Sequence, residues 1–124
     1  MSRVAVAVPL LAAMMVAATV GVADAHHAWN EVDTVRTVTL TGMVKSLKWE
    51  NPHSSLVLET TDGGSTVDWT VLMSGIARME SHGVDAATVA IGKTLTIVAS
   101  PARDEAHVVR ANRIRSDGKE HVLY

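Results

Sequence analysis

The sequence predicts an all-β fold: an OB-fold-like small Greek-key barrel of about five strands, with one helix between strands three and four. Two observations support this prediction. Segments with alternating apolar and polar residues recur from residue 37 to the end of the chain, and turn residues separate them. The pattern becomes helical only once, between the third and fourth of these segments.

Six segments carry the strand pattern, the last being a short tail: 37–49, 54–60, 66–72, 94–99, 108–115 and 120–123. Gly42 in the first segment indicates a bend or a bulge. Asn51-Pro52 ends that segment, because proline has no backbone N–H to donate to a neighbouring strand. Asp62-Gly63-Gly64 predicts a tight turn, so the second and third strands should form a hairpin.

The helix is expected over 73–82, where Ile76 and Met79 share one helical face. Ser74 is expected to cap the start of this helix and Gly83 to end it.

Three groups of side chains are interpreted as structural. Trp49 and Trp69 are expected in the core or the half-buried barrel wall, and Trp29 is a candidate anchor for the segment before the barrel. Surface positions are expected for two further sets of residues: Arg110, Asn112 and Arg113 on the fifth strand, and His82, His107 and His121, which show no metal-ligand spacing.

Residues 1–25 have the layout of a secretory signal peptide, with Arg3 followed by a long apolar stretch. Small residues, Ala23 and Ala25, occupy the −3 and −1 positions before His26. Cleavage after Ala25 would leave an irregular lead-in over 26–36 and a barrel domain over 37–124. The product would be periplasmic or secreted and would keep no membrane anchor.

Composition narrows the functional classes. The chain has no cysteine, so no disulfide can support the fold and no thiol can act as a nucleophile or a metal ligand. Its net charge is −2, which argues against a nucleic-acid partner. The sequence also lacks the common catalytic motifs, which favours a binding protein over an enzyme.

His26, His27 and His53 form the candidate metal site. After cleavage at Ala25, His26 offers its α-amine and its imidazole as a bidentate pair, and one further imidazole would complete a three-nitrogen copper site of the histidine-brace type. His53 follows Pro52 on a turn, which is a rigid mount for a ligand. Cleavage after Ala23 would instead place His26 third from a free amine, an arrangement that holds Cu²⁺ in a square plane.

Two functions therefore stay open. The first is copper binding or copper handling through the N-terminal histidine. The second is a metal-free accessory module that binds a partner protein or another ligand in the cell envelope.

Several short motifs carry a resemblance to a known family: Ala-His-His-x-Trp at 25–29, Val-Thr-Leu-x-Gly at 38–42, Trp-x-Asn-Pro-His at 49–53, Trp-Thr-Val at 69–71 and Ala-Ser-Pro-Ala-Arg-Asp at 99–104. With these, the chain resembles an uncharacterised family of small exported bacterial proteins, a domain of unknown function. The family usually has an aromatic residue shortly after Asn-Pro-His, where this chain has Ser54-Ser55-Leu56. The resemblance implies export and a fold but no activity.

The signal-peptide prediction is tested by intact-mass spectrometry of the exported protein. We expect a mass that begins at His26, because Ala23 and Ala25 fit the cleavage rule. In a chain that begins at Met1, His26 would have no free α-amine. In a chain that begins at Asp24, His26 would be the third residue from the free amine, in an Asp-Ala-His motif.

Overall fold

The computed structural model describes residues 29 and 31–124, which form six strands and one short helix. Their bounds are β1 Val38–Lys48, β2 Ser55–Asp62, β3 Ser65–Leu72, α2 Ile76–Ser81, β4 Thr94–Pro101, β5 Val108–Ser116 and β6 Lys119–Val122. No helix among the described residues is both long and apolar enough to cross a membrane.

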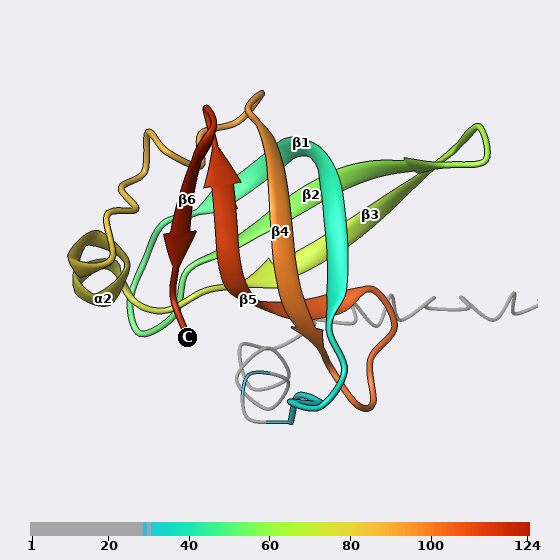
Figure 1. The fold of residues 1–124 in the computed structure, drawn as a ribbon, viewed down its shortest axis with the longest axis horizontal. Coiled ribbons are helices and arrows are strands. Elements are labelled where there is room, and N and C mark those ends of the chain that lie inside the picture. Colours follow the sequence, from blue (N-terminus) through green and yellow to red (C-terminus); the bar gives the residue numbers. More distant parts are fainter. Residues whose placement is uncertain (1–28, 30) are drawn as a thin grey trace, which may run out of the picture.

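The sheet closes on itself (Figure 1). Its strand order is β3-β2-β1-β4-β5-β6, and β3 also pairs in parallel with β5 from Thr70↔Val108 to Leu72↔Arg110. The five strands β1 to β5 thus form a closed barrel, which β6 extends along β5. The predicted small barrel, with its helix between the third and fourth strands, is confirmed.

Gly42 lies where β1 changes partners. Residues 38–43 of β1 pair with β4, and residues 43–48 pair with β2. A Cβ atom at Gly42 would lie 2.2 Å from the carbonyl oxygen of Glu59 on β2, so only glycine fits this approach. β1 curves across the barrel in Figure 1, and a β-bulge follows between Val44 and Ser46. The predicted bend or bulge in this strand is confirmed.

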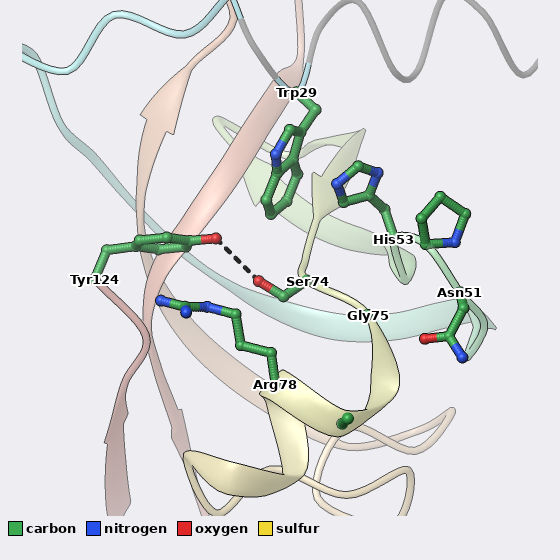
Figure 2. Close-up of a pocket in the computed structure, with 9 residues that line it drawn as sticks. Trp29, Asn51, His53, Ser74, Gly75, Arg78 and Tyr124 are labelled. Carbon is green, nitrogen blue, oxygen red and sulfur yellow. Dashed lines mark hydrogen bonds between the residues drawn. The ribbon is translucent and has the colours of Figure 1, made fainter.

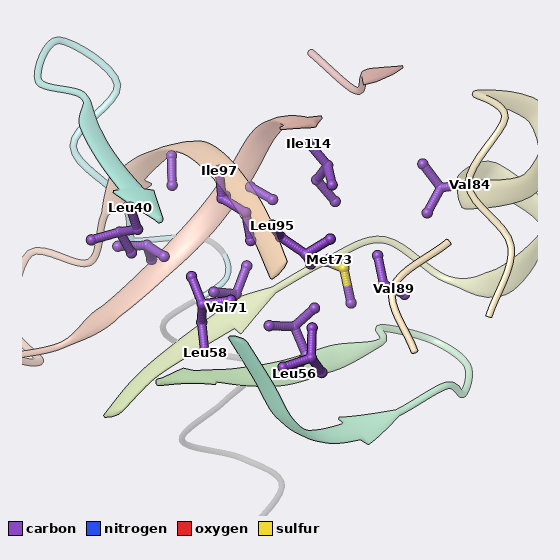
Figure 3. Packing of buried hydrophobic residues seen from close by; sticks show 14 of the residues in the cluster. Leu40, Leu56, Leu58, Val71, Met73, Val84, Val89, Leu95, Ile97 and Ile114 are labelled. Atoms are coloured by element: carbon purple, nitrogen blue, oxygen red, sulfur yellow. The ribbon is translucent and has the colours of Figure 1, made fainter. Parts of the chain in front are cut away.

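The core fills the barrel with side chains from all five barrel strands (Figure 3). Met79 of α2 is completely buried and packs the helix against this core. Val84 and Val89, from the segment between α2 and β4, add to the same cluster. Trp49 and Trp69 are half-buried and pack against it, as expected.

The start of the helix differs from the prediction. α2 begins at Ile76, and its N-cap residue is Gly75, not Ser74. The Ser74 hydroxyl instead lies 2.9 Å from the Tyr124 hydroxyl, and the side-chain oxygen of Asn51 accepts a hydrogen bond from the Ile76 N–H at 2.9 Å. The acceptor for the first N–H of the helix is thus Asn51, which is 25 residues away in the sequence, and not the nearby Ser74. The helix does end before Gly83, as expected.

Three of the predicted surface positions are wrong. Asn112 is half-buried, and its side-chain N–H donates to the Ser100 hydroxyl at 2.9 Å. His121 is only 7% exposed, because it lies on the inward-facing side of β6. Arg110 is half-buried, because Trp29 and Tyr124 pack against its guanidinium group. His82 and His107 are exposed, as predicted.

The close approach at Gly42 predicts that Gly42→Ala destabilises the fold. The added methyl group must displace the β2 backbone, and overpacking of this kind costs about 1–3 kcal/mol. Urea denaturation of the two proteins measures the difference. Ser46→Ala, at an exposed position of the same strand, is the control and should stay within about 0.5 kcal/mol of the parent. Equal stability of all three proteins would contradict this account of β1.

Candidate functional site

A cleft of about 500 Å³ lies beside the start of α2 (Figure 2). The turn after β1, the segment between β3 and α2, and the C-terminal residue meet there. Its lining residues are Trp29, Asn51, Pro52, His53, Ser74, Gly75, Ala77, Arg78 and Tyr124. A volume of this size is typical of small-molecule sites.

The turn that carries His53 is packed against, and hydrogen-bonded to, the segment between β3 and α2. Ser54 is completely buried, its N–H donates to the Ser74 carbonyl at 3.1 Å, and its carbonyl accepts from the Met73 N–H at 2.8 Å. Gly75 permits a further contact, since a Cβ atom there would lie 2.8 Å from both the Asn51 side-chain oxygen and the Pro52 carbonyl oxygen. These contacts fix the position of His53, which is half-buried at the cleft.

Trp29 packs against His53. Their ring centroids are 4.2 Å apart, with the ring planes tilted by 31°. The indole of Trp29 also packs against a small cluster made by Leu72 and Ala102, to which Val108 contributes. Trp29 thus anchors the end of the N-terminal lead-in to the barrel beside His53, and it supplies an aromatic neighbour that Ser54-Ser55-Leu56 cannot.

Two arginines alternate with aromatic rings next to this pair. The Arg110 guanidinium carbon lies 5.6 Å from the ring centre of Trp29 and 4.9 Å from that of Tyr124. Arg78 lies 5.0 Å from the ring centre of Tyr124. Tyr124 is held in place by its neighbour Leu123, which is buried and whose N–H donates to the Asn112 carbonyl at 2.8 Å. The result is a series of contacts from Arg78 through both rings to His53.

The charge at this cleft is positive. Arg78 lines the cleft, whereas Arg110 does not line it but contacts the Trp29 and Tyr124 rings that do. Neither arginine forms an ion pair with any described residue, and no carboxylate side chain lines the cleft. Arg78 donates one hydrogen bond, at 3.3 Å, to the Leu123 carbonyl. The Nε atom of Arg110 is buried and finds no acceptor within the described part of the chain. Unpaired guanidinium groups are ready to receive an anion.

A second cleft, of about 410 Å³, is lined by charges of both signs, some of which are paired within the protein. Lys93 forms an ion pair with Asp117, and the Asp85 carboxylate accepts hydrogen bonds from the Thr88 hydroxyl and backbone N–H. Those two bonds stabilise the charged form of Asp85 and lower its pKa. Lys119 also lines this cleft and forms no ion pair with a described residue, so the cleft presents charges of both signs to a ligand.

The predicted metal ligands are only partly described. His53 lines the first cleft, whereas His26 and His27 lie outside the described residues. Within residues 29 and 31–124, no three His, Cys, Asp or Glu side chains come together as a metal site. The sequence analysis did not identify Arg78, Arg110 or Tyr124 as site residues, because contacts distant in sequence bring them together and no local motif marks them.

The Asn51–Ile76 hydrogen bond predicts that Asn51→Ala destabilises the protein by about 1 kcal/mol, the usual effect of losing a helix N-terminal acceptor. Thermal or urea unfolding measures this loss. Asn51→Asp keeps an acceptor oxygen and should keep most of the stability. If the Asp variant were as unstable as the Ala variant, the hydrogen bond would not be what joins the turn to α2.

Comparison with known proteins gives a family but no activity. A protein-family model matches residues 13–110, which include the turn with His53 and the segment from β3 to α2. Neither a curated protein nor a solved structure matches the chain. The match confirms the resemblance to an uncharacterised domain. Because it covers most of the chain, the protein belongs to DUF6152, a family of unknown function.

Proposed function

We propose that this protein is an exported binding domain, rather than an enzyme, and that it binds copper after removal of residues 1–25. Its ligands would be His26, with His27 as a neighbour, and His53. The observation that carries the proposal is the packing of Trp29 against His53, with ring centroids 4.2 Å apart.

Chain length connects this contact to the N-terminal histidines. His26 is three residues before Trp29 in the sequence, and His27 is two residues before it. Three residues of extended chain span at most about 11 Å. The covalent chain therefore keeps both histidines within reach of a ring that touches His53.

The donor set favours copper. A free α-amine and imidazole groups are all nitrogen ligands, and Cu²⁺ binds such ligands more strongly than the other divalent first-row metals do. The absence of cysteine from the chain argues against a thiolate site. A free α-amine has an ordinary pKa of about 7.7–8.0. Copper binding should therefore weaken in acid, because protons compete with the metal for that nitrogen.

The second candidate is a metal-free accessory module that binds a partner protein or an envelope ligand. The observation that favours it is the cleft itself, which presents Arg78 and Tyr124 beside His53. This function needs neither a free amine nor His26. Binding of a ligand by the metal-free protein therefore distinguishes it from copper binding.

Copper titration of the processed protein tests the first proposal. We expect about one Cu²⁺ per chain, with a nitrogen-rich tetragonal EPR spectrum. Acetylation of the His26 α-amine should lower the affinity at least tenfold, because the acetylated nitrogen is no longer a free amine. His53→Ala should lower it at least tenfold as well, because it removes an imidazole ligand.

His82→Ala is the matched control, since His82 is exposed and lies outside the cleft. It should bind copper as tightly as the parent protein. Circular dichroism should show that both variants and the acetylated protein keep the fold. The proposal is wrong if His53→Ala and His82→Ala bind copper equally well, or if acetylation of the α-amine has no effect.

A further inference from the structure

We propose that the cleft also binds a small organic acid, a carboxylate attached to an apolar group. Arg78 and the paired hydroxyls of Ser74 and Tyr124 would receive the carboxylate, and the apolar walls would receive the rest of the ligand. This proposal goes beyond copper binding, because it depends on none of the N-terminal histidines.

Charge is the first argument. Two guanidinium groups, those of Arg78 and Arg110, lie at Tyr124 without an ion-pair partner among the described residues. The protein as a whole has a net charge of −2, so this local positive charge is not a general property of the chain. Arg78 lines the cleft, with no Asp, Glu or Lys beside it in the lining, and Arg110 adds positive charge behind the rings of Trp29 and Tyr124. Positive charge at a cleft attracts small anions.

Available donors are the second argument. A guanidinium group has five N–H donors, and Arg78 uses one in its 3.3 Å bond to the Leu123 carbonyl. Its contact with the Tyr124 ring restricts its orientation before any ligand arrives. The hydroxyls of Ser74 and Tyr124 lie 2.9 Å apart, so one donates to the other and the second hydrogen can point to an anion. Planar guanidinium donors match the two oxygens of a carboxylate.

The walls of the cleft are the third argument, and they distinguish an organic acid from an inorganic anion. Trp29, Pro52 and Ala77 add apolar surface to the lining of the cleft. Figure 2 shows Trp29 on the cleft wall between His53 and Tyr124. A bare phosphate ion would leave this surface in contact with water. A ligand that covers it gains the hydrophobic contribution as well as the charge contribution.

Benzoate is the first probe, because it joins a carboxylate to a flat apolar ring. It is titrated into the processed protein, stripped of metal on a chelating resin, while amide NMR signals are recorded. We expect saturable shifts at Ser74, Gly75, Arg78 and Tyr124. Benzamide, the neutral analogue, acetate and inorganic phosphate should each bind at least fivefold more weakly, because each lacks either the charge or the apolar ring.

Variants locate the site. Arg78→Gln should weaken benzoate binding at least fivefold, and Arg78→Lys should fall between Gln and the parent, because lysine keeps the charge but loses the planar donor pair. Arg115→Gln is the matched control, since Arg115 is also exposed and does not line the cleft. The protein acetylated at the His26 α-amine should bind benzoate normally, which separates this proposal from the copper site.

The proposal is overturned if benzamide binds as tightly as benzoate, because the guanidinium charge then contributes nothing. It is also overturned if phosphate binds as tightly, because the apolar walls would then have no role. Equal effects of Arg78→Gln and Arg115→Gln would place the binding outside this cleft.

Discussion

The parallel pairing of β3 with β5 is the contact on which the rest of the structure depends. It joins strands on opposite sides of the sheet order, at Thr70↔Val108 through Leu72↔Arg110, and so closes the barrel around its core. The same three-residue contact brings Arg110 beside the end of β3, directly before Ser74 and α2. The pairing that closes the barrel thus also places the arginine against which two rings of the cleft wall, those of Trp29 and Tyr124, pack. The chain has no disulfide, so this packing must hold both the barrel and the cleft wall.

Aromatic rings connect the barrel to the proposed chemistry. Trp29 contacts His53 on one side and the Arg110 guanidinium on another, and Tyr124 contacts both Arg110 and Arg78. Both rings come from the ends of the described chain, outside the strands. The barrel therefore provides a fixed base, because the His53 turn is hydrogen-bonded to the segment after β3. Trp29 and Tyr124 complete the site on this base. Copper and an organic acid would use neighbouring parts of this arrangement.

Local patterns were sufficient to predict the barrel but not the cleft. Alternation and turn residues predicted the strands to within a few residues, since these signals depend on neighbours in sequence. The cap of α2 was missed, because Asn51, 25 positions before Ile76, provides the acceptor. Arg110 was predicted to face solvent because strand alternation points it out of the barrel, and alternation cannot show that Trp29 and Tyr124 cover that face. His53 was selected for its turn, and the structure does place it at a cleft.

The most direct test of the central claim, that the N-terminal histidines act together with His53, is paramagnetic broadening of amide NMR signals by Cu²⁺. One equivalent added to the processed protein should broaden the signals of Trp29, His53 and Ser74, which lie around the cleft, and leave those of Gly63 and Gly64 sharp, because they lie at the far end of the β2–β3 hairpin. Broadening confined to the first few residues, with His53 and Ser74 unaffected, would show that the histidines of the lead-in bind copper without the barrel and would contradict the account.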